Sequence, residues 1–424
     1  MNIKSYFNKI SYNLVNVFFS QGSTLLVNIF LARWFEKEIY GQYALFLITI
    51  NTIVSISGLG LSNFANRFIS EYKYSNLQRA SEILSFCIKL IFLSSLIFSI
   101  LVVTISPFLS FILIGSQYFT LYFIISGLII FLMSLNVFSL GVASSLGIFS
   151  KMATTNIIVG IFYITICLFF AHFGGILATL GGILLSAIIQ FTIFFFVIQK
   201  ELKLHNIKVL NLPLIQEIGL IKDWILPSVL SGLTTMPAIW IIQFLLTKLS
   251  NGKFADTALF NVSFSFVSVI LLFPSLVNAV STNFLNEIIG IDKDKYTKAF
   301  QLNLLTNLIP IALIVLFCIL FGHQLLSIYG QQYIVAYPIF LILVISTIPD
   351  AASIALSQYF YSHNQMWLSF KLINIFRDFP MVISSIILIP FYGAIGAAIA
   401  YFIGKFIGFL GAYWGYRKIQ FKTI

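Results

Sequence analysis

Long apolar runs separated by short polar breaks fill almost the whole chain. A helix that crosses a bilayer needs about 20 mainly apolar residues, and the runs reach that length. When the runs are read against the loop residues between them, they predict twelve spanning helices. Some runs are longer than a bilayer requires, which predicts tilted or kinked helices. The expected spans are 10–34, 41–66, 80–106, 117–148, 151–172, 175–199, 222–248, 256–283, 297–321, 333–361, 364–390 and 393–416.

Composition excludes the soluble classes of protein. Hydrophobic residues make up 59% of the 424 positions and charged residues only 9%, whereas a soluble domain carries about 25% charged residues. No polar stretch reaches the roughly 50 residues that a soluble catalytic domain needs. The predicted fold class is an all-α polytopic membrane protein.

The positions of lysine and arginine predict the orientation in the membrane. If the N-terminus is cytoplasmic, sixteen of the 24 basic residues fall in cytoplasmic segments and four in outside segments. Basic residues collect on the cytoplasmic side of membrane proteins. We therefore expect a multi-pass protein of the cell inner (plasma) membrane with both termini cytoplasmic. The net charge of +11 is then a sign of orientation, and no nucleic-acid partner is expected.

The longest polar break lies halfway along the chain and divides it into two sets of six spans. It predicts an N-terminal lobe over 1–199, a cytoplasmic linker over 200–222 with an amphipathic piece at 212–221, and a C-terminal lobe over 223–424. An offset of 214 residues places 40–46 on 254–260, which indicates a duplication. Two six-helix repeats have the same orientation, so we expect two lobes around a central cavity.

Two spans carry polar residues along one face. The stripes occupy equivalent places early in each half and predict a shared hydrated cavity, because membrane helices keep polar groups away from lipid. Helix packing, which small and polar residues also favour, is the alternative. In 222–248, Pro227 and Pro237 predict either a static kink or a hinge. The stripe residues are Asn13, Asn16, Ser20, Ser23, Thr24 and Asn28, and Asn261, Ser265, Ser268, Ser275, Asn278 and Thr282; the candidate cavity residues among them are Asn16, Ser20, Asn28, Asn261 and Asn278.

Six ionisable residues fall deep within predicted spans, where each costs at least about 2.5 kcal/mol. Cations exceed anions, which favours a phosphate-bearing cargo. We expect Lys371, Arg377 and Lys405 to face that phosphate, with Asp350 and Asp378 as ion-coupling candidates. The alternative is two permanent structural pairs, Lys371–Asp378 and Arg377–Asp350, since Lys371, Asn374 and Asp378 share a face of a regular helix. The six residues are Lys89, Asp350, Lys371, Arg377, Asp378 and Lys405.

Catalytic and cofactor signatures are missing from the sequence. The four histidines form no metal-binding motif, there is no phosphate-binding glycine loop, and the three cysteines sit singly inside apolar runs. We expect no enzymatic activity, no metal and no cofactor. Transport coupled to a proton or sodium gradient fits better than a nucleotide-driven pump.

Several motifs resemble those of a known family. They are Ile389–Ala400, which begins the last span, Gly58–Gly60 followed by Arg67–Glu71, and Leu31–Arg33 followed by Tyr40–Gly41. They resemble the bacterial O-antigen flippases of the multidrug/oligosaccharidyl-lipid/polysaccharide exporter superfamily. The resemblance implies alternating access and an undecaprenyl-diphosphate-linked oligosaccharide as cargo, for O-antigen or capsular polysaccharide biosynthesis. It makes the polysaccharide polymerase machinery a candidate partner.

Three other functions compete with this interpretation. A multidrug or small-solute antiporter of the same superfamily would have an acidic cavity, against the cation surplus here. A membrane polysaccharide polymerase or ligase resembles chains with a large polar outside loop, whereas the longest one expected here has about ten residues. Peptidoglycan lipid II flippases usually have fourteen helices and cavity arginines, which this chain lacks.

Overall fold

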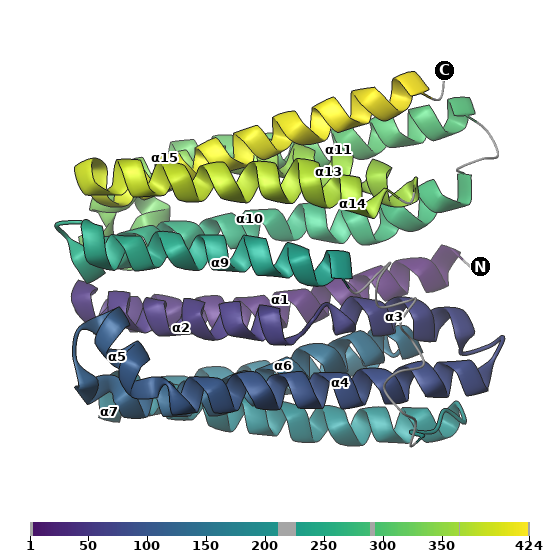
Figure 1. Ribbon diagram of the computed structural model, residues 1–424, viewed down its shortest axis with the longest axis horizontal. Helices are drawn as coiled ribbons and strands as arrows, with labels where there is room; N and C mark the ends of the chain where they lie inside the picture. Colours follow the sequence, from purple (N-terminus) through teal and green to yellow (C-terminus); the bar gives the residue numbers. More distant parts are fainter. Residues whose placement is uncertain (1–2, 211–225, 289–292, 364, 423–424) are drawn as a thin grey trace. The chain divides into compact units, whose positions relative to one another are not determined.

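The computed structural model describes residues 3–210, 226–288, 293–363 and 365–422 of the chain. Within these ranges the side chains of 3–17, 227–228, 275–276, 278–288, 293–294 and 420–422 are not described. The regular structure in the described ranges is all helical (Figure 1). The amphipathic piece expected at 212–221 lies outside them.

The first half of the chain contains long helices joined by tight turns. The turn after the second helix contains Leu59 and Gly60, both with positive φ, so the single span expected at 41–66 is divided into two helices. The helices are α1 (Ile3–Trp34), α2 (Lys37–Ser57), α3 (Leu61–Tyr72), α4 (Leu77–Thr104), α5 (Ser106–Ile114), the 3₁₀ turn η1 (Gln117–Phe119), α6 (Thr120–Leu146) and α7 (Phe149–Leu204).

The second half repeats this pattern with more interruptions. Its C-terminal elements include one 3₁₀ segment and one π-helical segment, neither of which the apolar pattern predicts. The elements are α9 (Leu226–Leu249), α10 (Lys253–Ile288), α11 (Lys293–Ser327), the 3₁₀ segment η4 (Gln331–Ala336), α12 (Tyr337–Ile345), α13 (Thr347–Ser362), α14 (Met366–Ser369), the π segment η5 (Phe370–Ile375) and α15 (Phe376–Lys422).

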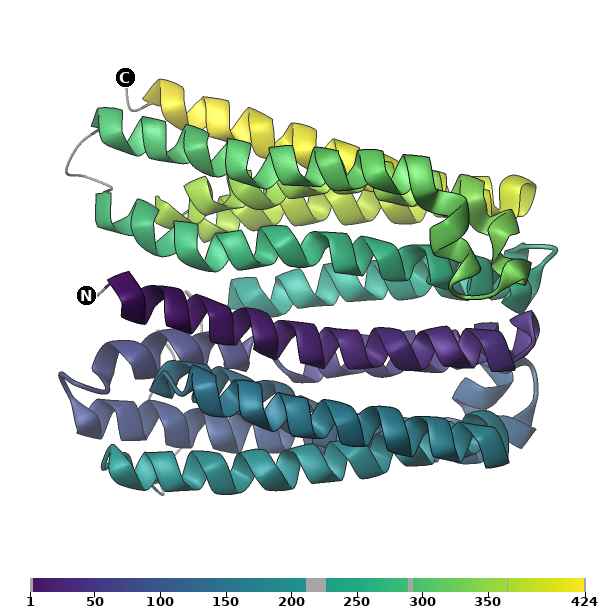
Figure 2. The same cartoon turned by 180° about the vertical axis from the view of Figure 1, so that it is seen from behind.

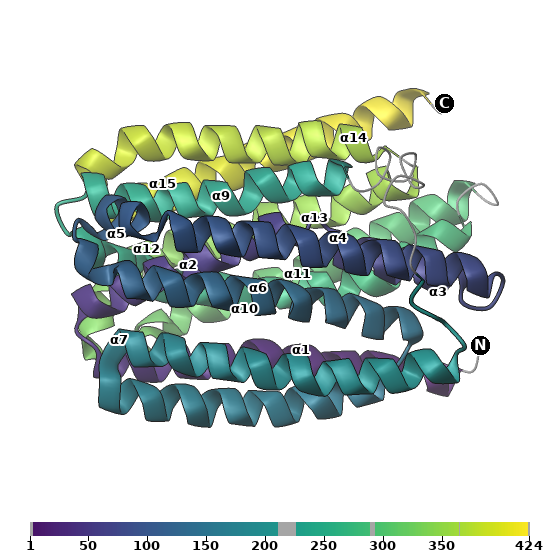
Figure 3. The ribbon, with the colours of Figure 1, turned by 60° about the horizontal axis from the view of Figure 1, so that its bottom comes forward.

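Two of these helices reverse direction at glycines. α7 leaves the helical conformation at Gly174 and Gly175, and α15 does so at Gly393, where φ is +53°. Figure 3 shows the two arms of α7 side by side. Nine helices in the described residues are long and apolar enough to cross a membrane. Counting both arms of α7 and α15, and adding α1, gives the twelve expected spans, so the predicted fold class is confirmed.

The chain forms two compact units, one of residues 1–34 and 46–236 and the other of residues 35–45 and 237–424. In the first unit, α1 runs along α7 (Figure 2), and α3, α4 and α6 enclose a core that includes Phe64, Cys87 and Phe138. In the second unit, α11, α13 and α15 enclose an aromatic core around Phe300 and Tyr359. Cys87, Cys167 and Cys318 are free and buried, as their apolar surroundings predict.

Candidate functional site

The second unit buries charged residues where α13 meets α15. Asp350 lies in the first turn of α13, and a carboxylate there is stabilised by the positive end of the helix dipole. Pro349 precedes it, and proline is well accommodated in a first helical turn because its missing N–H is not needed there. The local sequence therefore both starts the helix and places the carboxylate at its buried end.

Lys405 of α15 reaches Asp350 across the helix interface. Its Nζ donates to Asp350 Oδ2 at 2.7 Å, and the two side chains are only 7% and 5% exposed. The Nζ also lies 5.0 Å from the centre of the Tyr401 ring, a cation–π contact one turn back along the same helix. This pair ties the second arm of α15 to α13.

A second ion pair forms between neighbours in sequence. Arg377 Nε donates to Asp378 Oδ1 at 2.7 Å, and its Nη2 donates to Oδ2 at 3.1 Å. This forked arrangement is the strongest that an arginine makes with a carboxylate. The side chains are 13% and 4% exposed, so the pair lies inside the unit.

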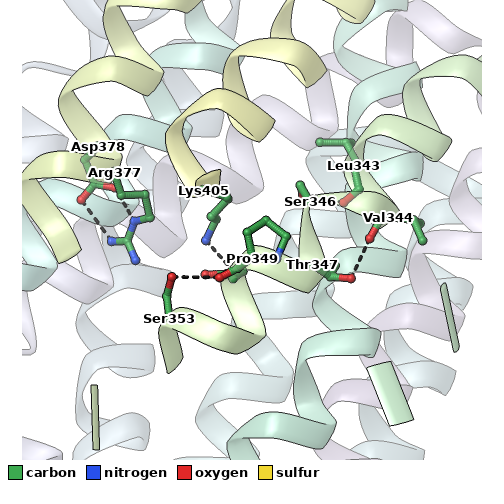
Figure 4. Close-up of polar contacts among 10 residues, drawn as sticks. Leu343, Val344, Ser346, Thr347, Pro349, Ser353, Arg377, Asp378 and Lys405 are labelled. Atoms are coloured by element: carbon green, nitrogen blue, oxygen red, sulfur yellow. Dashed lines mark hydrogen bonds and ion pairs between the residues drawn. The ribbon is translucent and has the colours of Figure 1, made fainter. Parts of the chain in front are cut away.

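The two pairs form one cluster of four charges (Figure 4). Arg377 interacts electrostatically with Asp350 as well as with Asp378, and it repels Lys405. Two cations therefore balance two anions. The cation surplus expected from the sequence is not present in this cluster, and a ligand anion would have to compete with an aspartate for either cation.

Lys371 does not belong to the cluster. It is exposed, whereas Asp378 is buried, so the two do not share a face. Asp378 pairs with Arg377 and Asp350 pairs with Lys405, which differs from the Lys371–Asp378 and Arg377–Asp350 pairs of the alternative prediction. The reason is the π segment η5, which contains Lys371 and ends three residues before Asp378. An i→i+5 turn contains an extra residue and so shifts the helical phase of Lys371 relative to Asp378.

Hydroxyl groups around Asp350 donate to backbone carbonyls three or four residues earlier in the chain. Ser346 and Thr347 donate to the carbonyls of Leu343 and Val344, each at 2.6 Å, and Ser353 donates to the carbonyl of Pro349 at 2.8 Å. Figure 4 shows these bonds around the charge cluster. The hydroxyls thus stay buried without competing for the carboxylate, and Asp350 is left to Lys405.

The polar stripe of α1 is partly a packing face. Ser23 is buried against α7, where a side chain at Gly160 would approach its Cβ to 3.5 Å, and Thr24 bonds to Tyr163 of α7. Ser20 and Asn28 are half-buried. The side chain of Asn16 lies outside the described residues.

The stripe of α10 divides in a similar way. Ser265 is hydrogen-bonded at 2.7 Å to the hydroxyl of Tyr329, which is buried. Asn261 is half-buried and Ser268 is exposed. The side chain of Asn278 lies outside the described residues. Packing thus accounts for part of each stripe, and Ser20, Asn28 and Asn261 remain candidates for a cavity.

Two buried polar features were not predicted. Glu201 is buried and pairs with Lys151 between the two arms of α7, although it falls in the stretch expected as a cytoplasmic linker. Gln243 of α9 is fully buried, and neither its amide nitrogen nor its oxygen finds a hydrogen-bond partner among the described residues. An unsatisfied buried amide costs about 1–3 kcal/mol. A glutamine in the middle of an apolar run is the signal that would have identified it.

Comparison with solved structures gives likenesses over nearly the full chain. An inward-facing multidrug resistance MATE family transporter of the MOP superfamily superposes with a TM-score of 0.78 at 16% identity, covering 97% of this chain and 98% of that one. The chain therefore has the MATE transporter fold. No family model matches the chain, and no curated protein matches it.

Two further structures extend the likeness. The eukaryotic MATE transporter AtDTX14 gives a TM-score of 0.73 at 14% identity, covering 96% of this chain and 94% of that one. A MOP superfamily transporter from Pyrococcus furiosus gives 0.72 at 17% identity, covering 97% and 95%; the reversed polarity of its binding pocket suggests a different function for it. The solved structures thus match the superfamily of the sequence resemblance, while the O-antigen flippase subfamily rests on the motifs alone.

Proposed function

We propose that the protein is a membrane transporter that works by alternating access and is driven by an ion gradient. The observation that carries this proposal is the likeness in fold to transporters over 97% of the chain. The buried charge cluster supports the coupling to an ion, because protonation of Asp350 would break the ion pair that holds Lys405. Transport driven by an ion gradient needs no nucleotide or cofactor.

For the cargo, we propose a lipid-linked oligosaccharide, with its diphosphate meeting Arg377 and Lys405 when the aspartates are released. The motifs at Ile389–Ala400 and Gly58–Gly60 support this cargo. Arginine supplies the forked donor set that suits a phosphate. Asp350 and Asp378 accept from those donors in the structure, so cargo binding and proton uptake by an aspartate would be linked.

The second candidate is export of small amphipathic solutes, as in a multidrug antiporter. Two observations favour it: several of the solved structures are multidrug or MATE transporters, and the charge cluster is neutral rather than cationic. The likeness to multidrug and MATE transporters favours small-solute export over the oligosaccharide, because the oligosaccharide is supported by sequence motifs alone.

A deletion strain separates the two cargoes. Loss of oligosaccharide flipping should leave diphosphate-linked glycan in the inner leaflet and remove the surface polysaccharide, and the wild-type gene should restore it. Loss of solute export should instead lower the tolerance to cationic dyes and drugs, with surface polysaccharide unchanged. An Asp350→Asn, Lys405→Gln double variant should fail to complement whichever defect appears, because it removes the coupling group while keeping the site neutral.

A further inference from the structure

A groove runs along the second arm of α15 in the second unit. It has a volume of about 490 Å³, within the range of small-molecule sites. The walls come from α11, α12, α13 and α15, and every lining residue is aliphatic or aromatic. On α15 the lining begins at Phe402 and ends at Tyr416.

The groove is open along one side, and its other side is formed by closely packed side chains. Phe406 and Tyr413 are 44% and 41% exposed, so an occupant can enter from outside the unit. Leu356, Phe409 and Tyr416 belong to or pack against the aromatic core of the unit, so the floor is a packed surface. Because the walls are candidate membrane-spanning helices, a lipid chain in a surrounding bilayer could reach the open side.

One end of the groove carries positive charge. Arg417 follows the last lining residue, and its Nε donates to the hydroxyl of Tyr413 at 3.0 Å. Its guanidinium also lies 5.4 Å from the centre of that ring. The terminal nitrogens of this exposed arginine form no hydrogen bond to any residue in the part of the chain that the structure describes. Lys418 lies 5.1 Å from the ring of Trp414 and adds a second cation at the same end.

The dimensions fit one lipid chain. The helix from Phe402 to Tyr416 rises about 21 Å, while one leaflet of hydrocarbon is about 15 Å thick. The lining also includes Pro349 and Phe406, which adjoin the Asp350–Lys405 pair in sequence. An acyl chain would thus lie in an apolar groove that is at least as long as one leaflet is thick. The anionic head group of the same lipid would then meet Arg417, beyond the aromatic residues.

We propose that this groove is a binding site for one anionic phospholipid, with an acyl chain along Phe402–Tyr416 and the phosphate group on Arg417. Clusters of basic residues at the end of spanning helices bind anionic lipid head groups. The bound chain would hold α11 and α13 against α15 and so steady the helix that carries Lys405. The inference requires only that the protein spans a membrane, so it can fail while the proposed transport stands.

Native mass spectrometry of the purified full-length protein measures this binding. Titration with phosphatidylglycerol and with phosphatidylcholine of the same acyl chains should show one lipid retained per chain, with phosphatidylglycerol favoured about five-fold. Arg417→Gln should reduce that preference. Lys203→Gln, a matched loss of an exposed basic residue on α7, should leave it unchanged. Equal retention of both lipids by the wild-type protein would overturn the proposal.

Blocking the groove tests the position of the chain. Ile348→Trp fills the groove from α13 and should abolish the retained lipid, whereas Leu316→Trp, on an exposed part of α11 outside the groove, should not. If Ile348→Trp fails to fold, a phosphatidylglycerol with a photoreactive acyl chain on the wild-type protein gives the same answer. Adducts should map to peptides around 402–416 and 304–308. Adducts elsewhere, or retention of polyprenyl lipids only, would contradict a phospholipid site.

Discussion

Four buried charges in the second unit are paired with one another. Asp350 and Lys405 are both more than nine-tenths buried and are 2.7 Å apart. Removing one member of such a pair leaves a buried charge without compensation, whereas removing both leaves none. The stability of single and double variants therefore reports whether the pair is permanent, and transport reports whether it also takes part in the cycle.

Asp350→Asn alone should lower the free energy of unfolding by about 3–5 kcal/mol, because Lys405 stays charged in the interior. The double Asp350→Asn, Lys405→Gln variant should recover most of that loss. Chemical unfolding in detergent measures both. The control is Lys371→Gln, at an exposed position, which should change stability by less than about 0.5 kcal/mol. Equal loss in the single and double variants would mean that the pair does not hold in solution.

Arg377→Lys tests the forked contact with Asp378. A lysine keeps the charge but cannot make both bonds at once, so stability should fall by about 2 kcal/mol. If a cargo phosphate uses the same fork, transport in proteoliposomes should fall further than the stability loss explains. Transport at the wild-type rate, in protein that remains folded, would remove Arg377 from the candidate site.

Elements differ in how far the sequence predicts them. An apolar run of about 20 residues can cross a bilayer only as a helix or as part of a closed barrel, so all twelve spans could be placed. The break near Gly393 was indicated by its motif. The partners of the charged residues could not be predicted from the sequence, because the prediction assumed the period of a regular α-helix over the whole span. The π segment η5 changes the period between Lys371 and Asp378. The Asp350–Lys405 contact joins residues 55 positions apart, a distance over which periodicity carries no information.

The reversal in α15 depends on a single glycine. Gly393 has a φ of +53°, and a Cβ there would come within 2.5 Å of Asp256 Oδ2, at the start of α10. Gly393→Ala should therefore lower stability by about 1–3 kcal/mol. Gly181→Ala is the matched control, since nothing lies within 4 Å of its Cβ position, and it should be neutral or slightly stabilising. Thermal unfolding of the two variants compares them directly, and a neutral Gly393→Ala would argue against this turn.

At the scale of the whole molecule, the twelve candidate spans place successive loops on alternate sides of the membrane. The direction rests on the distribution of lysine and arginine, which predicts both termini in the cytoplasm. The same distribution assigns the α9–α10 turn to the outside and the end of α7 to the cytoplasm. Opposite labelling of those two places is therefore the sharpest consequence of the predicted topology.

Cysteine labelling in whole cells measures that consequence. The three native cysteines are buried and can be replaced by alanine to give a silent background. In that background, Asn251→Cys in the α9–α10 turn should react with an impermeant maleimide added outside. Lys203→Cys near the end of α7 should react only after the cells are opened. Both positions are exposed, so a difference in labelling reports the side of the membrane rather than burial. Labelling of Lys203→Cys in intact cells would reverse the orientation, and with it the side from which cargo and coupling ion reach Asp350.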